Sequence, residues 1–231
     1  MDILNKTAIV TGVSKGIGLA TAKLLLDQGV KVAGWSRSKP KFTHKNFFFA
    51  PVDVGNNESV KAGYEQTVKH FGSEIHILIN NAGLGFTATF EDMPDEEWHQ
   101  MFKTNVDSIF YCSRLVIPEM KKLDMGHIIN ISSIAGTNGI EMMAGYCGTK
   151  HAVRGISQAM FKELRNFGIK VSVIYPGSVN TNFFDDIDAV NANDNMMMPE
   201  DIASTIMHVL TTPPNYHHID IEVRPLRPKG K

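Results

Sequence analysis

The amino-acid sequence predicts an α/β protein built on a doubly wound parallel sheet of about seven strands, with helices on both faces. Short runs rich in Val and Ile recur along the chain, separated by longer stretches of helical spacing. The runs show little alternation between apolar and polar residues, which is typical of parallel strands buried on both faces. Repeated strand–helix–strand alternation with right-handed crossovers builds such a sheet. We therefore expect one domain spanning residues 1–231.

The expected elements alternate along the whole chain. The apolar runs predict strands at Lys6–Thr11, Val30–Trp35, Asn46–Ala50, Ile75–Ile79, His127–Ile131, Lys170–Tyr175 and Ile219–Val223. The helical spacing predicts helices at Ile17–Gln28, Glu58–Phe71, Asp95–Lys122, Ala144–Phe167 and Glu200–Leu210. The irregular segment 181–199, rich in Asn, Asp and Met, follows the sixth strand, so we expect it to form a lid over a ligand site. His217 and His218, before the last strand, are expected in solvent.

Composition and charge exclude several classes of protein. The 231 residues include 23 basic and 24 acidic side chains, for a formal net charge of −1. Nucleic-acid and membrane surfaces need clustered Lys and Arg, so neither partner is expected. Cys112 and Cys147 are too few for a disulfide framework or a cysteine-based zinc site, and the histidines lack ligand spacing, so we expect no metal. Without a basic-then-apolar leader or a membrane-length apolar run, we expect a cytoplasmic protein.

A glycine-rich turn follows the first strand and opens the first helix. It reads TGVSKGIG and spans Thr11–Gly18. Glycines allow a tight turn and let the backbone approach a pyrophosphate, which the free N–H groups of the helix N-terminus can bind. Glycine spacing alone is a weak signal, since a purely structural turn shares it, but the location between strand and helix strengthens it. We expect a dinucleotide cofactor at this turn.

The end of the second strand predicts which dinucleotide binds. A cofactor with a free ribose 2′-hydroxyl usually meets a carboxylate about 20 residues after the glycine turn. This strand instead ends Trp35-Ser36-Arg37-Ser38, without a carboxylate. Arg37 can bind a 2′-phosphate through two hydrogen bonds, and Lys15 in the turn lies on the same side. Either cation alone could be an ordinary surface residue, but together they favour NADP(H) over NAD(H).

A tyrosine and a lysine four residues apart, Tyr146 and Lys150, share one face of an expected helix. Such a pair often arises by chance. However, a whole series of segments resembles the short-chain dehydrogenase/reductase family, in the same order and over essentially all 231 residues. The segments are Thr11–Gly18, Asp53-Val54, Asn80-Asn81-Ala82-Gly83, Asn105, Ser132-Ser133, Tyr146–Lys150 and Pro176-Gly177 through Thr181. This resemblance implies a Rossmann-like fold and an NADP-dependent oxidoreductase.

The resemblance implies four catalytic residues. Hydride transfer to a carbonyl develops negative charge on oxygen, so the site needs a proton donor and hydrogen bonds there. Tyr146 would be the general acid and base, and the ammonium of Lys150 would favour its phenolate. Ser133 would orient the carbonyl. Asn105 would anchor a water that links the lysine to solvent, the alternative being an asparagine bonded locally inside a helix.

The resemblance also implies the residues that hold the cofactor. Asp53 would accept a hydrogen bond from the adenine amino group, and Val54 would lie beside the ring. Val179 and Thr181 would hold the carboxamide of the nicotinamide. The expected set is Gly12, Ser14, Lys15, Gly16, Ile17, Gly18, Ser36, Arg37, Asp53, Val54, Asn81, Ala82, Gly83, Tyr146, Lys150, Pro176, Gly177, Val179 and Thr181.

These residues predict NADPH-dependent reduction of a ketone or aldehyde, such as a 3-oxo acid, a 3-oxoacyl thioester or a small carbonyl, to an alcohol. The tail 221–228 resembles the 3-hydroxy acid dehydrogenase and small-carbonyl reductase branch more than 3-oxoacyl-carrier-protein reductases, which usually end in a glycine-bearing segment. An arginine of this tail could meet an acidic substrate or bond across a subunit interface. Met142, Met143, Phe183 and Phe184 are candidates to line the substrate pocket. The alternative is a catalytically silent NADP-binding sensor or scaffold.

Two expected helices carry small and apolar residues beyond one core face. They are Asp95–Lys122, with Phe110 and Val116, and Ala144–Phe167, with Gly148 and Gly155. In the family these helices pair across subunits as a four-helix bundle. The resemblance therefore implies a homotetramer or a homodimer.

Overall fold

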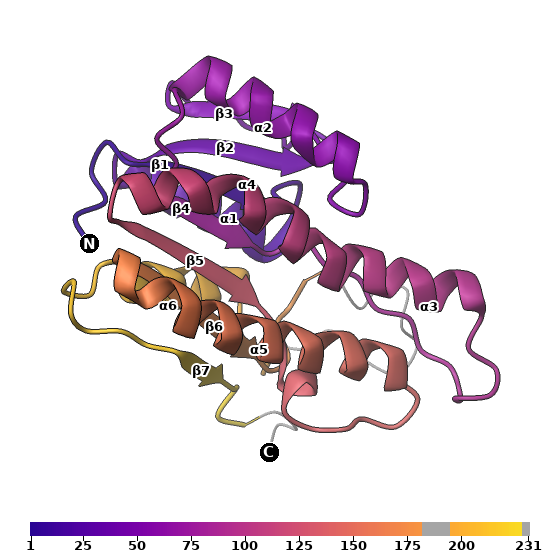
Figure 1. The fold of residues 1–231 in the computed structure, drawn as a ribbon. Coiled ribbons are helices and arrows are strands. Elements are labelled where there is room, and N and C mark those ends of the chain that lie inside the picture. Colours follow the sequence, from indigo (N-terminus) through magenta and orange to yellow (C-terminus); the bar gives the residue numbers. More distant parts are fainter. Residues whose placement is uncertain (182–194, 228–231) are drawn as a thin grey trace.

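The computed structural model describes residues 1–181 and 195–227, and its strands form one seven-stranded sheet (Figure 1). Every strand pair is parallel, and the order is β3-β2-β1-β4-β5-β6-β7. The strands are β1 (Thr7–Thr11), β2 (Lys31–Ser36), β3 (Phe47–Pro51), β4 (Ile77–Asn80), β5 (Gly126–Ile131), β6 (Ile169–Pro176) and β7 (Asp220–Val223). The order reverses between β1 and β4, which opens a crevice at their carboxyl ends. The doubly wound, Rossmann-like sheet predicted from the sequence is confirmed.

Helices cover both faces of the sheet (Figure 1). On one face lie α1 (Gly16–Asp27) and α6 (Pro199–Leu210), and on the other lie α2 (Asn57–Phe71), α4 (Ser108–Lys122) and α5 (Ala144–Leu164). Successive residues of β1 serve different cores: Ala8 and Val10 pack on the α1 side, and Ile9 packs on the α2 side. All three are fully buried. Because both faces are covered, the strands need apolar side chains at every position, which explains the unbroken apolar runs in the sequence.

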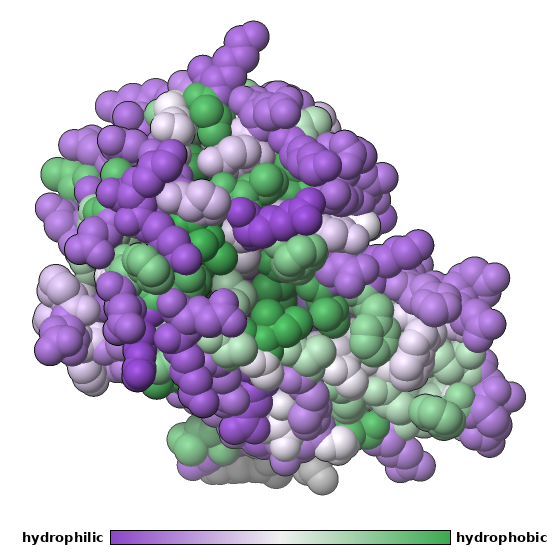
Figure 2. Space-filling model, in the orientation of Figure 1, coloured by the Kyte–Doolittle hydropathy of each residue, from purple (hydrophilic) through white to green (hydrophobic). Residues whose placement is uncertain are grey.

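The surface shows one apolar region. In Figure 2, apolar side chains gather between α4 and α5, within a largely polar periphery. Phe110 of α4 is 56% exposed, a high value for a large aromatic side chain. No helix in the described part of the chain is long and apolar enough to cross a membrane.

The helix expected over Asp95–Lys122 is interrupted. α3 (Asp95–Phe102) is followed by a π-helical turn, η1 (Lys103–Asp107), before α4 begins. The N–H of Ser108 donates to the carbonyl of Lys103, five residues back, as a π-helix requires. The expectation of one continuous helix was therefore wrong, because the apolar spacing stays helical through the π-turn. Asn105, at the centre of this turn, bonds other segments of the chain, as described below.

Smaller differences concern the ends of elements. The helix expected to reach Phe167 is α5, and it ends in a 3₁₀ turn, η3 (Arg165–Phe167). A second 3₁₀ turn, η2 (Ile134–Gly136), follows β5. Of the expected lid 181–199, residues 182–194 lie outside the described residues, including Phe183 and Phe184, and Pro199 already begins α6.

A cluster of histidines lies at the amino-terminal edge of the sheet. The expectation that His217 is in solvent was wrong, because its ring lies 5.8 Å from the ring of His127 and its Nε2 lies 2.9 Å from the carbonyl oxygen of Val171. The fully buried His127 places Nε2 2.9 Å from the Oγ of Ser172, whose own proton goes to the carbonyl of His218 at 2.6 Å. The hydroxyl therefore accepts from His127, and Nδ1 of this neutral ring has no hydrogen-bond partner within the described residues.

Acid is expected to destabilise the fold through His127. Burial lowers the pKa of His127 well below its ordinary value, and the nearby His217, Lys170, N-terminal amine and His218 lower it further. Below about pH 6.5 the unfolded chain therefore binds a proton that the folded chain excludes. Above that pH the contribution of the neutral His127 ring to stability should be fully present. As the pH falls further, the free energy of unfolding should decrease by up to about 1.4 kcal/mol per pH unit. Urea unfolding at about pH 7.5 and about pH 5.5 measures this loss.

The matched variant is His127→Gln, because a glutamine amide keeps a donor near Ser172 but does not titrate. It should lose less stability between the two pH values than the natural protein. Some loss should remain, since burial also lowers the pKa values of His76 and His217. An unchanged loss in the variant would show that His127 is not the source.

Candidate active site

A cavity of about 640 Å³ opens at the carboxyl ends of the strands, where the sheet order reverses. Its walls come from the turns after β1, β2, β3 and β4, from the ends of β5 and β6, and from α5 and η1. A volume of this size is typical of ligand and cofactor clefts. All the residues expected to bind cofactor or to catalyse line this cavity, with the exception of Gly18 and Asn105.

The glycine turn after β1 has the geometry that its sequence predicts. Gly12 and Gly16 have φ angles of +73° and +60°, in the left-handed region that favours glycine. A Cβ atom on Gly18 would lie 2.3 Å from the carbonyl oxygen of Gly12 and 2.5 Å from Nδ2 of Asn81. Gly18 therefore permits the close packing of α1 against the turn and does not form part of the cavity wall.

The loop after β4 is bound to this turn. The Oγ1 of Thr11 accepts hydrogen bonds from the N–H groups of Asn81 at 2.9 Å and Ala82 at 3.0 Å. The Nδ2 of Asn81 donates to the carbonyl of Thr11 at 2.9 Å. These bonds hold the two turns that flank the crevice in one arrangement.

The N-terminus of α1 faces the cavity without a side-chain cap. Lys15 occupies the capping position and makes no capping hydrogen bond, and the first turn contains no acidic residue. The free N–H groups and the positive end of the helix dipole therefore remain available to an anion. Together with the absence of side chains at Gly12 and Gly16, this arrangement fits the diphosphate of a dinucleotide.

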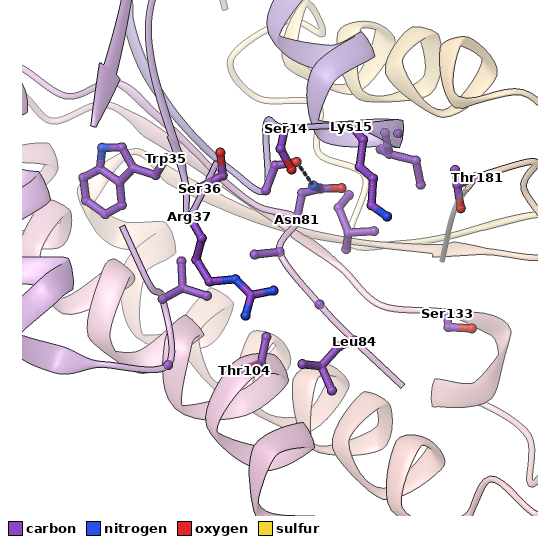
Figure 3. Close-up of a pocket in the computed structure, with 18 of the residues that line it drawn as sticks. Ser14, Lys15, Trp35, Ser36, Arg37, Asn81, Leu84, Thr104, Ser133 and Thr181 are labelled. Atoms are coloured by element: carbon purple, nitrogen blue, oxygen red, sulfur yellow. Dashed lines mark hydrogen bonds between the residues drawn. The ribbon is translucent and has the colours of Figure 1, made fainter. Parts of the chain in front are cut away.

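Besides Lys150, three cations line the cavity: Lys15, Arg37 and Lys103. Figure 3 shows Lys15 and Arg37 extending into the cavity from different segments. Within the described residues, none of the three forms an ion pair. The carboxylate of Asp53 also lines the cavity, and its Oδ1 accepts a hydrogen bond from the N–H of Gly55 at 3.0 Å. The excess of positive charge suits a ligand with several phosphate groups.

The other end of the cavity holds a serine, a tyrosine and a lysine. The Oγ of Ser133 accepts a hydrogen bond from the N–H of Ala135 at 3.1 Å, and the hydroxyl bonds the phenol of Tyr146. The Nζ of Lys150 lies 5.6 Å from the ring centroid of Tyr146 and donates to the carbonyl of Ile131 at 3.0 Å. Tyr146 and Lys150 are both buried. A hydroxyl, a phenol and an ammonium group thus meet at one place.

Burial is the largest influence on the pKa values at this end. It raises the pKa of Tyr146 to about 12, against the effect of the hydrogen bond with Ser133, and it lowers the pKa of Lys150 to about 8. The phenolate of Tyr146 loses hydration inside the protein, which outweighs nearby favourable contacts. At neutral pH Tyr146 therefore keeps its proton and Lys150 remains mostly charged.

Asn105 lies behind the cavity wall and is 2% exposed. Its Oδ1 accepts a hydrogen bond from the N–H of Leu84 at 2.9 Å, and its Nδ2 donates to the carbonyl of Leu84 at 2.8 Å and to the Oγ1 of Thr149 at 3.0 Å. The side chain therefore joins the loop after β4 to α5. The alternative expectation for Asn105 was local hydrogen bonding inside a helix. Its side chain instead forms hydrogen bonds with distant segments of the chain.

Sequence reasoning missed part of the cavity wall. The additional residues are Trp35, Ser38, Val52, Gly55, Leu84, Gln100, Lys103, Thr104, Ile131 and Ser132. Most of them are sequence neighbours of expected residues at strand ends, so the position of each strand end in the sequence also indicates them. Gln100, Lys103 and Thr104 come from the end of α3 and from η1, where no strand end or glycine marks a site. Figure 3 shows Thr104 and Leu84 on the same wall.

The fold and the cavity define a Rossmann-like α/β protein with a hydroxyl, a phenol and an ammonium group at one end of its cleft. The chain belongs to the short chain dehydrogenase family, whose model matches residues 6–192. It is an oxidoreductase of that family.

Known proteins of similar sequence and structure agree with this assignment. An uncharacterized oxidoreductase of Staphylococcus aureus (strain USA300) is 34% identical, over 97% of this chain and 99% of the relative. One of Staphylococcus haemolyticus (strain JCSC1435) is 33% identical over the same shares. Among solved structures, the closed form of serine dehydrogenase complexed with NADP+ has a TM-score of 0.87 and 28% identity over 94% of both chains. ElxO with NADP bound has a TM-score of 0.86 and 26% identity over 96% of this chain and 98% of that one.

Proposed function

We propose that the protein is an NADPH-dependent oxidoreductase that reduces a ketone or an aldehyde to an alcohol. The observation that carries this proposal is the meeting of Ser133, Tyr146 and Lys150 in the same cavity as Arg37 and the uncapped N-terminus of α1. NADPH, when bound, supplies the hydride for the carbonyl carbon. Similarity to two proteins whose structures contain NADP supports the choice of cofactor.

Each of the three side chains has its own task in this proposal. The oxygen of Ser133 accepts the N–H of Ala135, and its hydroxyl bonds the phenol of Tyr146, so the two hydroxyl groups lie where both would bond the carbonyl oxygen of a bound substrate. Tyr146, protonated at neutral pH, donates its proton to that oxygen as negative charge develops. The ammonium of Lys150 favours the phenolate that remains. In the reverse reaction Tyr146 takes the proton from the alcohol.

The remaining cavity residues divide the cofactor between them. Arg37 and Lys15 would bind the 2′-phosphate, and the N-terminus of α1 the diphosphate. Asp53 has a second carboxylate oxygen that could accept from the adenine amino group, since only Oδ1 bonds Gly55. Val179 and Thr181 also line the cavity and would hold the carboxamide of the nicotinamide.

The apolar region between α4 and α5 supports a homo-oligomer in which these helices pair between subunits. Phe110, 56% exposed in the single chain, would then be buried. The mass of the purified protein in solution tests this, and a monomer at all concentrations would refute it.

An assay of the purified protein with NADPH and a panel of ketones, aldehydes and thioesters tests the proposed function. We expect NADPH fluorescence to change on binding, and NADPH absorbance to fall with at least one carbonyl. Binding without turnover over a broad panel would instead favour a catalytically silent NADP-binding protein.

A further inference from the structure

An apolar wall lies beside the Ser133–Tyr146 end of the cavity. Tyr146 and Cys147 belong to a small core cluster with Met101 and Ala135. The partly buried side chains packed against this cluster are all apolar: Leu84, Phe86, Met93 and Met143. Leu84 and Tyr146 both line the cavity, so this apolar cluster adjoins the end that holds the proposed acid.

The wall consists of two loops and α3, and hydrogen bonds and packing hold them together. The N–H of Ala88, in the loop after β4, donates to the carbonyl of Met142 at 3.0 Å, in the loop before α5. Trp98 of α3 packs directly over Gly145, where a Cβ atom would lie 3.1 Å from the indole. Leu84 is fixed by its two hydrogen bonds to Asn105. The apolar surface is thus part of a defined structure.

The same loops contain no basic side chain. Residues 84–94 and 134–145 include Glu91, Asp92 and Glu141, and no Lys, Arg or His. All three carboxylates are exposed.

The cations that line or approach the cavity come from other segments than the two loops of the wall, and some of them already have partners. Lys15, Arg37 and Lys103 line the cavity, and Lys15 and Arg37 are the two proposed to bind the 2′-phosphate of the cofactor. The ammonium of Lys150 donates to the carbonyl of Ile131. In the tail, whose backbone at Arg224 approaches Gly177, the guanidinium of Arg224 is paired with Glu222. The two loops of the wall, residues 84–94 and 134–145, therefore supply no cation of their own.

A carboxylate substrate would therefore lose hydration at this wall without gaining a counter-ion from the two loops, and their exposed carboxylates would repel it. An uncharged substrate avoids both costs and gains contact with apolar surface. We propose that the substrate is an uncharged carbonyl compound with an apolar substituent, and that free 3-oxo acids are poor substrates. This inference rests on the proposed function and narrows its substrate class.

Ethyl acetoacetate and acetoacetate form a matched pair for the test, because they share the ketone and differ in the charge of the carboxyl group. With NADPH, kcat/KM should be about ten- to hundredfold higher for the ester, the range expected for burying an uncompensated polar or charged group. Equal values, or a preference for the acid, would overturn the inference and leave the proposed function intact. If neither these substrates nor any other carbonyl is reduced, the proposed function itself fails.

Charge reversal at a carboxylate of these loops gives an independent test. Glu141→Lys, in the loop that carries Met143, should raise kcat/KM for acetoacetate relative to the ester by about two- to fivefold, as expected for exposed charges, and added salt should reduce the effect. Glu65→Lys makes the same change of net charge on α2, away from the cavity, and should leave the ratio unchanged. Met143→Lys should shift the ratio further, with Met143→Leu as its control. The same ratio in all four variants would overturn the inference.

Discussion

Tyr146→Phe is expected to lower kcat for NADPH oxidation by about 100- to 10,000-fold, the usual contribution of a positioned general acid. The substitution keeps the aromatic ring packed against Met101, Ala135 and Cys147 and removes only the hydroxyl that bonds Ser133. The fold and the remainder of the cavity should therefore stay intact. Steady-state kinetics with the best carbonyl of the panel measure the loss.

Two measurements separate a chemical role of Tyr146 from a structural one. Fluorescence titration should show that Tyr146→Phe binds NADPH about as well as the natural protein. Tyr111→Phe, which removes a tyrosine hydroxyl from α4 outside the cavity, should keep normal turnover. Normal turnover in Tyr146→Phe would contradict the proposed mechanism, and a joint loss of binding and turnover would point to a structural role.

Much of the fold could be predicted from the sequence because burial on both faces leaves a strong local signal. Ile9 and Val10 face different cores, yet both are fully buried, so the strand reads as an unbroken apolar run. The π-turn Lys103–Asp107 leaves no such signal. Asn105 in this turn forms hydrogen bonds with Leu84 and Thr149, which are distant in sequence. The helical spacing of apolar residues predicts neither these tertiary contacts nor the π-helical turn.

The expected site residues come mainly from strand ends, and for that reason the structure places most of them around one cavity. Arg37 follows β2, and Ser133 follows β5, so their positions relative to the sheet follow from topology alone. Lys103 reaches the same cavity from η1, and its position depends on how the helices pack. The influence of burial on Tyr146 and Lys150 likewise depends on tertiary packing. The sequence therefore indicated only that Lys150 would favour the phenolate of Tyr146, whereas burial in the structure raises the pKa of Tyr146.

Arg37→Ala is expected to weaken NADPH binding by about ten- to hundredfold, because hydrogen bonds to a charged group contribute about 1.5–3 kcal/mol. NADH lacks the 2′-phosphate, so its binding should change little. Arg37 is exposed, lines the cavity and has no ion-pair partner among the described residues, so its removal should leave the fold unaffected. Titration of each variant with both cofactors gives the ratio of dissociation constants.

Two control variants show whether position and shape of the cation matter. Lys39→Ala removes a nearby exposed cation that does not line the cavity, so it should affect both cofactors equally and weakly. Arg37→Lys keeps the charge but loses the planar fork that binds phosphate through two hydrogen bonds, so it should fall between Arg37→Ala and the natural protein. Equal losses for NADPH and NADH in Arg37→Ala would refute the phosphate contact. The same loss in Lys39→Ala would mean that the general positive field, and not Arg37 itself, selects the cofactor.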